Sequence, residues 1–151
     1  MVEVHKRMYL GMLLACARAV SGACGVEGSV GLATKGFGVE TSLDFYADYN
    51  ADVALYHTLA FGPAMSLEPI AINTGSVSFV SVPNATVYDL SGLGTELEFS
   101  AAYGRGLGVD FAGNIDPSGQ GTFAISPQAQ SGFGSEAHWY ITYSRPLYQS
   151  K

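Results

Sequence analysis

Three oxygen-bearing side chains stand at alternate positions in one short segment of the chain. Asp48, Asn50 and Asp52 match the first, third and fifth positions of a calcium-binding loop. The pattern then stops, because Val53 stands where such a loop needs its glycine and Leu59 where it needs a bidentate glutamate. The competing interpretation is a hairpin turn whose Asx side chains bond their own backbone. We expect the turn, with calcium as the alternative, and no other cofactor.

Two glutamates raise the question of acid–base catalysis. Glu96 and Glu98 share one face of a predicted strand, about 7 Å apart along it, and this separation is compatible with the paired carboxylates of a glycosidase. Leu97 and Phe99 occupy the opposite face. We therefore expect the glutamates to mark the solvent side and Phe99 to lie in the core with Phe45. The histidines are too scattered for a zinc signature, so we expect a non-enzymatic domain.

The only tryptophan of the chain lies in an aromatic segment near the C-terminus. Trp139 and Tyr143 share one face of a predicted strand, and Tyr140 lies on the other. In a soluble fold one face would fill the core, whereas in a membrane barrel the same residues would form an interfacial girdle. Binding surfaces concentrate their energy in a few aromatic and arginine anchors. The candidate ligand-binding residues are therefore Trp139, Tyr140, Tyr143 and Arg105.

These residues need a framework, and the chain predicts one made of strands. From Gly25 onward, short segments with apolar residues at alternate positions are separated by Gly, Pro, Asn and Asp. No segment shows the helical pattern that parallel units require. We expect one all-β domain over residues 25–151, an antiparallel meander forming a small barrel or sandwich of about eight to ten strands. The predicted strands cover residues 26–34, 39–49, 53–61, 67–72, 76–82, 85–89, 95–103, 107–112, 121–126 and 137–144.

Glycines predict where the strands bend and turn. Gly104, Gly106 and Gly108 fall on one strand face and strip it of side chains, which admits a bend or a bulge. A nucleotide-binding loop is not expected, because no helix pattern follows these glycines. The sequence Asp-Pro-Ser-Gly at 116–119 predicts a β-turn.

Residues 1–24 have the layout of an export signal. Lys6 and Arg7 precede an apolar run over residues 8–16, and small residues follow. The run is too short to cross a bilayer as a helix, which takes about 20 apolar residues. The alternative is a short amphipathic helix packed on the body. Its apolar stripe would contain Leu10, Leu13, Leu14 and Ala17.

Both cysteines fall in this segment. An uninterrupted helix would hold Cys16 and Cys24 about 12 Å apart, so we expect no disulfide between them. The small residues before Cys24 resemble a bacterial lipoprotein processing box, which makes Cys24 a candidate lipidation site.

The charge balance limits the partners. Seven Lys and Arg stand against thirteen Asp and Glu, giving a net charge of −6, which has the wrong sign for a protein that neutralises phosphates. Only 13% of the residues are charged and 48% are hydrophobic, which excludes intrinsic disorder. We therefore expect no nucleic acid partner.

Residues 84–94 read NATVYDLSGLG, and they are followed by a glycine-rich strand pair and by HWYITY at 138–143. This arrangement resembles the glycine-rich all-β tail domains found after YD-repeat (Rhs-type) cores in bacterial surface and secreted proteins. The resemblance implies an exported β module or an effector tail, and it supplies no catalytic residue.

We therefore expect an exported, non-enzymatic β-domain, secreted or in the cell envelope of a bacterium, that acts as a binding or surface module. One alternative is a small outer-membrane β-barrel, and another is a toxin-like effector tail. The partner would be a protein, a glycan or a membrane surface, and self-association stays open.

Overall fold

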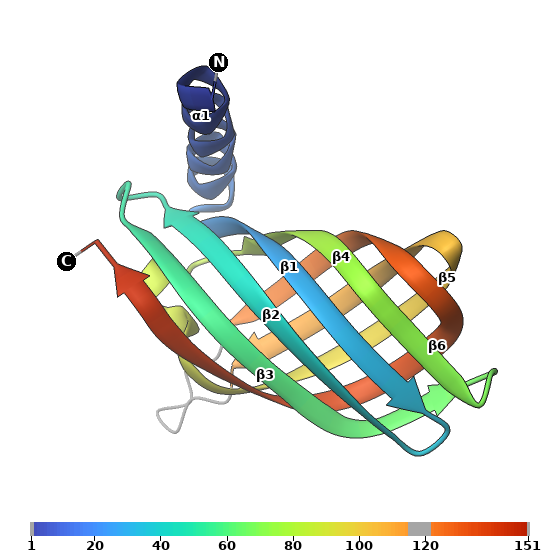
Figure 1. Ribbon diagram of the computed structural model, residues 1–151. Helices are drawn as coiled ribbons and strands as arrows, with labels where there is room; N and C mark the ends of the chain where they lie inside the picture. The colour runs from blue at the N-terminus through green and yellow to red at the C-terminus, as the bar shows by residue number, and fades with distance from the viewer. Residues whose placement is uncertain (1, 115–121, 151) are drawn as a thin grey trace.

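The computed structural model describes residues 2–114 and 122–150, and its main feature is a sheet that closes on itself (Figure 1). Six antiparallel strands follow the order β3-β2-β1-β4-β6-β5, and β3 also pairs with β6, so the sheet forms a ring. The all-β fold with a short N-terminal helix is confirmed. The elements are α1 (Val2–Val20), β1 (Ala23–Thr34), β2 (Phe37–Asp48), β3 (Val53–Ser66), β4 (Ile70–Val82), η1 (Val87–Leu90), β5 (Gly92–Asn114) and β6 (Phe123–Gln149).

The last two strands are longer than predicted, because the chain passes through its glycines without leaving the sheet. β5 joins the predicted segments 95–103 and 107–112, and β6 likewise extends beyond its predicted parts. Gly104 pairs with Gly132, and both have positive φ values, 89° and 155°, which glycine adopts readily. Both strands bend at this level, so β6 pairs with β4 before the bend and with β3 after it. The sheet therefore has six strands, fewer than the eight to ten that the alternating pattern predicted.

The two faces of the strands are the reverse of the prediction. Phe99 is 49% exposed, whereas Glu98 is 2% exposed. The expectation that Phe99 lies in the core and that Glu96 and Glu98 face solvent is therefore wrong. Phe45 is half-buried beside α1 and does not share a core with Phe99. The physical reason is that a period of two separates the faces of a strand without indicating which face encloses the interior.

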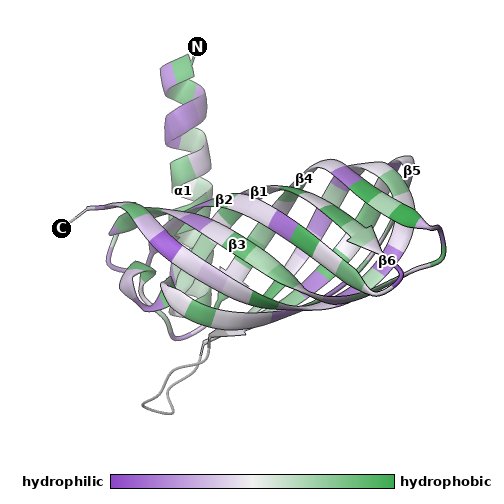
Figure 2. Cartoon of the chain, turned by 60° about the horizontal axis from the view of Figure 1, so that its bottom comes forward, coloured by the Kyte–Doolittle hydropathy of each residue, from purple (hydrophilic) through white to green (hydrophobic). Residues whose placement is uncertain are grey.

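The outer surface of the ring is apolar. Among the described residues, no Asp, Glu or Lys points outward from a strand, and the arginines that do so are Arg105 and Arg145. Figure 2 shows apolar positions recurring along the strands. Large outward side chains include Val30, Leu32, Val39, Leu43, Leu59, Phe61, Ile72, Val77, Phe79, Leu97, Ile125, Phe133 and Ile141.

Apolar clusters lie near both ends of the interior. At the end where α1 joins the ring, Val87 and Leu90 of η1 pack with Tyr56. The backbone N–H of Val87 donates to Asp48 Oδ2 at 3.0 Å, and the Tyr56 hydroxyl donates to the Val87 carbonyl. At the far end, Tyr140 packs with alanines from several strands. The segment predicted as a strand after residue 84 is therefore a short helix that plugs one mouth of the ring.

Cys16 and Cys24 form a disulfide, contrary to expectation. The helix ends at Val20, and the chain reverses through Ser21, whose φ is 50°. This turn brings the Cα atoms of the two cysteines to 6.0 Å. The prediction that they stay apart is wrong because the helix stops before Cys24. Lipidation of Cys24 stays a prediction, and it requires a chain in which this disulfide is absent.

Helix α1 stands on the outside of the ring and projects away from it (Figure 1). Its second half packs on the sheet through Leu13 and Ala17, both of which are buried, while its first half is exposed. Within the described ranges, no helix combines the length and apolarity of a membrane span. Cleavage before Cys24, which would remove the N-terminal segment as an export signal, stays a prediction. The predicted turn at 116–119 lies outside the described residues.

Candidate functional site

The interior of the ring gathers the acidic side chains of the strands. Alternation directs each of them inward, where it is buried or half-buried. Every Lys and Arg among the described residues is exposed. Of the basic side chains in these residues, His138 is therefore the one that is buried with the acids. The interior therefore carries an excess of carboxylates. They belong to Glu27, Glu40, Asp44, Asp48, Glu96, Glu98, Asp110 and Glu136.

His138 lies among three of these carboxylates. Its Nε2 is 2.8 Å from Glu96 Oε1 and 3.6 Å from Glu98 Oε2, and its Nδ1 is 3.6 Å from Glu136 Oε2. The Tyr140 ring stacks on the imidazole, with the centroids 3.5 Å apart and the planes at 7°. Glu98 lies directly opposite His138 in the β5–β6 register, so same-face residues two positions along also reach it.

Amides and hydroxyls complete this network. Gln128 Nε2 donates to Glu98 Oε1 at 2.7 Å, and Ser78 Oγ donates to Gln128 Oε1 at 3.3 Å. Glu96, Glu98 and His138 each offer one ligand atom, and these atoms lie within 4.8 Å of one another. Two carboxylates and an imidazole suit a transition metal. In this structure His138 Nε2 contacts Glu96 and Glu98, whereas His138 Nδ1 and Glu136 Oε2 are buried without a hydrogen-bond partner.

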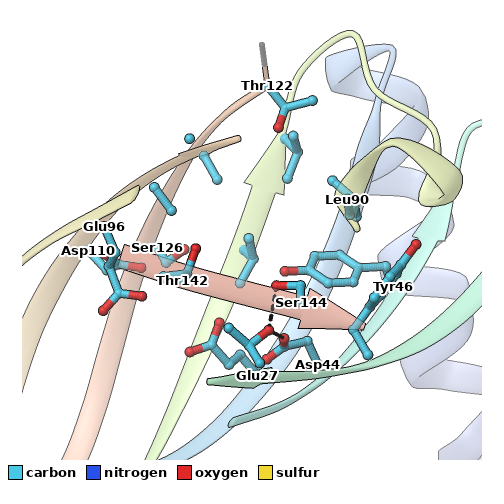
Figure 3. A pocket seen from close by; sticks show the side chains of 17 residues that line it. Glu27, Asp44, Tyr46, Leu90, Glu96, Asp110, Thr122, Ser126, Thr142 and Ser144 are labelled. Carbon is cyan, nitrogen blue, oxygen red and sulfur yellow. Dashed lines mark hydrogen bonds between the residues drawn. The ribbon is translucent and has the colours of Figure 1, made fainter. Parts of the chain in front are cut away.

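A cavity of about 70 Å³ lies beside this network, toward the end that η1 closes (Figure 3). Glu96 borders both the network and the cavity, and Glu27, Asp44 and Asp110 bring three more carboxylates to the cavity wall. The Thr58 hydroxyl donates to Asp44 Oδ2 at 2.7 Å. Asp44 Oδ1 and Asp110 Oδ1 are buried without a hydrogen-bond partner. Among the described residues, no Lys, Arg or His lines this cavity.

The sheet separates the residues predicted to bind a ligand together. Trp139 and Tyr143 are exposed on the outer face of β6, whereas Tyr140 is buried inside the ring. Arg105 is exposed on β5, next to the bend at Gly104. These side chains therefore do not form one surface, and their part in ligand binding stays a prediction.

Asp48, Asn50 and Asp52 lie together at the turn between β2 and β3. Asp48 Oδ1 accepts hydrogen bonds from the backbone N–H of Asn50 at 2.9 Å and of Asp52 at 3.1 Å. Asp48 Oδ2 accepts the N–H of Val87. Backbone donors thus occupy both oxygens of the carboxylate, as in the Asx-turn interpretation. Calcium binding by these three residues stays a prediction.

At the far end, Glu68 in the turn between β3 and β4 connects this turn to β5 and β6. Its Oε2 accepts the N–H of Ser135 at 2.9 Å, and its Oε1 accepts the Tyr103 hydroxyl at 2.7 Å. These two donors hold the pKa of the Glu68 carboxyl below its usual range. The Tyr103 ring also packs edge-on against Phe133, with the centroids 5.6 Å apart.

Sequence reasoning missed the acids of the cavity as a group. Glu27, Asp44 and Asp110 are far apart in the chain, and only the closed sheet brings them together. A signal was present, because each stands on the polar side of an alternating segment. No family model, curated protein or solved structure matches the chain. The resemblance to the tail domains of YD-repeat proteins therefore stays a prediction.

Proposed function

We propose that this chain is a small membrane-spanning β-barrel of a bacterial cell envelope, with lipid against its outer face and a closed, acidic interior. The observation that carries the proposal is the placement of charge. Every Asp and Glu on the described strands points into the ring, and the outward positions are predominantly apolar. Soluble monomers rarely expose contiguous apolar patches beyond roughly 300–600 Å². A ring covered with apolar side chains is stable where lipid covers it.

The lengths of the strands support this proposal. β1 to β4 contain 12, 12, 14 and 13 residues, and a tilted strand of about 9–11 residues crosses the hydrocarbon core. Figure 1 shows the strands running obliquely around the ring. Closure through the β3–β6 pairing also matters, because an open sheet edge would leave backbone groups without partners in lipid.

Aromatic side chains occur near both ends of the outer face, where a membrane barrel places its interfacial girdles. Phe37 and Trp139 are exposed toward the far end, and Tyr49 and Tyr148 are exposed toward the α1 end. The girdle interpretation of Trp139 thus has support from exposed aromatic side chains at both ends of the outer face.

The apolar clusters near the two ends of the interior favour an anchoring or surface-binding role over a channel. η1 fills one mouth, and Tyr140 with its alanine neighbours fills the other. An exported soluble module is the competing function, and it would require a partner protein to cover the outward apolar side chains.

Refolding separates these two functions. The chain, diluted from urea, is expected to regain strand content in the presence of lipid vesicles and to aggregate in plain buffer, as followed by circular dichroism and light scattering. Refolding to a monodisperse protein in buffer without detergent or lipid would overturn the membrane proposal.

A further inference from the structure

We infer that Glu96, Glu98 and His138 bind one divalent transition metal ion of the zinc class. Each of these buried residues offers one ligand atom, and the three atoms lie within 4.8 Å of one another. Within the part of the chain that the structure describes, no other group of His, Cys, Asp and Glu side chains comes together in this way. The site lies inside the ring, so it does not depend on whether lipid or a partner protein covers the outer face.

The pairing of β5 with β6 positions all three ligands. Glu98 lies directly opposite His138 in the β5–β6 register. Glu96 precedes Glu98 by two positions, so both side chains point from the same face of β5 into the ring. The ligands therefore stand on two hydrogen-bonded strands, which hold side chains more precisely than loops do.

The distances between the ligand atoms suit a metal among them. Zinc forms bonds of about 2.0–2.2 Å to imidazole nitrogen and carboxylate oxygen, which places two tetrahedral ligand atoms about 3.4 Å apart. His138 Nε2 lies 3.6 Å from Glu98 Oε2, close to that separation. Its 2.8 Å contact with Glu96 Oε1 is a hydrogen bond. The metal would take the place of the shared proton there, and Glu96 would withdraw by about half an ångström.

Two orphaned atoms behind the imidazole are a second, separate observation. His138 Nδ1 and Glu136 Oε2 are buried and 3.6 Å apart, and neither has a hydrogen-bond partner. A neutral imidazole carries a single N–H. When Nε2 directs it at Glu96, Nδ1 is an acceptor that faces another acceptor. Buried polar atoms nearly always have a partner, so this pair needs an explanation.

A metal on Nε2 supplies the explanation. Ligation uses the lone pair of Nε2, so the ring proton lies on Nδ1, from which it donates to Glu136 Oε2. Histidines that bind metals almost always donate their other N–H to a carboxylate, a carbonyl or a water. Glu136 is therefore the positioning residue of the site, and the ion gives both orphaned atoms a partner.

The donor set and the charge select the class of metal. Calcium and magnesium take oxygen ligands, whereas imidazole suits zinc and its transition-metal neighbours. Three acids surround His138 while every Lys and Arg of the described residues is exposed, so a divalent ion offsets a costly excess of buried negative charge. Three protein ligands leave zinc one position for water. Glu96 also borders the cavity of about 70 Å³, which has room for that water.

Metal content of the refolded chain tests the site. Because the ligands are buried, Zn²⁺ is added while the full chain, free of any affinity tag, refolds from urea in lipid vesicles, and unbound metal is then removed. We expect one zinc ion per chain by elemental analysis, and Co²⁺ in its place should give the visible absorption of a four-coordinate site. A folded parent chain that retains neither metal would overturn the site. The same measurement applies in plain buffer if the chain folds there, so it stands apart from the membrane proposal.

Matched variants assign the ligands. Glu98→Gln removes a ligand charge at nearly constant volume, and it should weaken zinc binding at least about tenfold in competition with a chromophoric chelator. Glu27→Gln removes an interior acid outside the group, and it should change the affinity by less than about threefold. His57→Asn, on the outer face, should keep one ion per chain. Equal losses in Glu98→Gln and Glu27→Gln would contradict the site, because they would show only general attraction to the acidic interior.

The ring nitrogens of His138 provide a signature that a purely structural histidine lacks. In the zinc-loaded chain the ring proton should lie on Nδ1 alone, as read by long-range ¹H–¹⁵N NMR. Glu136→Gln should keep one ion per chain but bind it about tenfold more weakly. A proton that stays on Nε2 in zinc-saturated protein would refute ligation by His138, and unchanged affinity in Glu136→Gln would refute the positioning role. The measurements on the parent chain decide the matter where a variant fails to fold.

Discussion

Trp139 and Tyr140 are neighbours in the chain and face opposite sides of the sheet. Trp139 is 64% exposed and its indole N–H donates to the Thr95 hydroxyl, whereas Tyr140 is 1% exposed and stacks on His138. One step along β6 therefore leads from an apolar surface to an acidic interior. Substitutions at adjacent positions therefore test two different environments.

A charge on the outer face should be costly. Leu43 lies in the middle of β2 and is exposed. Leu43→Lys is therefore expected to destabilise the vesicle-inserted protein by about 2–4 kcal/mol, the cost of a lysine near the bilayer midplane. Denaturant titration in vesicles measures this free energy. Leu67→Lys is the control, because Leu67 lies in the exposed turn between β3 and β4. Equal, negligible effects of both substitutions would indicate that water covers the outer face.

Loss of the interior histidine should also be costly. His138→Ala removes the base between Glu96 and Glu98, and breaking a buried ion pair from one side typically costs about 3–5 kcal/mol. His57→Ala is the matched control, because His57 lies on the outer face and bonds the Thr41 hydroxyl at 2.8 Å. Its loss should cost about 1 kcal/mol. Unfolding free energies that rank the other way would contradict the placement of His138.

The plug at the α1 end depends on Asp48. Asp48→Ala removes the acceptor for the N–H groups of Asn50, Asp52 and Val87, and leaving the buried Val87 N–H unpaired costs about 1–3 kcal/mol. Hydrogen exchange at the Val87 amide should accelerate in this variant. Asn50→Ala, which changes an exposed side chain in the same turn, should leave that exchange rate unchanged. Comparable acceleration in both variants would argue against the Asx turn.

The N-terminal segment has its own test. With the disulfide formed, Cys16 and Cys24 should resist thiol alkylation in the folded full chain until a reductant is added. Immediate alkylation would show that α1 is not tied to β1. Intact mass of protein recovered from its cells decides the export signal, because cleavage before Cys24 would remove Cys16 and exclude this disulfide from the mature chain.

The alternating segments predicted the strands but not their orientation. Glu40, Ser42 and Asp44 alternate with Val39 and Leu43, a pattern that fits a soluble sandwich and a lipid-facing barrel equally well. Which face of a strand points inward depends on whether water or lipid surrounds the fold. The sequence of a single strand does not indicate which of the two it is.

Two further features depended on the path of the chain. Gly104 predicted a bend, but the sequence did not show that it pairs with Gly132 and that two long strands stay continuous there. Cys16 and Cys24 pair because the helix ends at Val20, four residues before Cys24, and no glycine at the first position after the helix marked this end. The acids that line the cavity come from distant parts of the chain, and only closure of the ring brings them to one cavity.

The central claim is that lipid contacts the outer face, and Trp139 tests it most directly because it is the only tryptophan of the chain and lies on that face. The measurement is Trp139 fluorescence of the folded chain in vesicles whose acyl chains carry bromine, compared with unbrominated vesicles. We expect strong quenching by the brominated chains. Emission that is unchanged between the two lipids, in protein shown by circular dichroism to be folded, would contradict the membrane-spanning barrel.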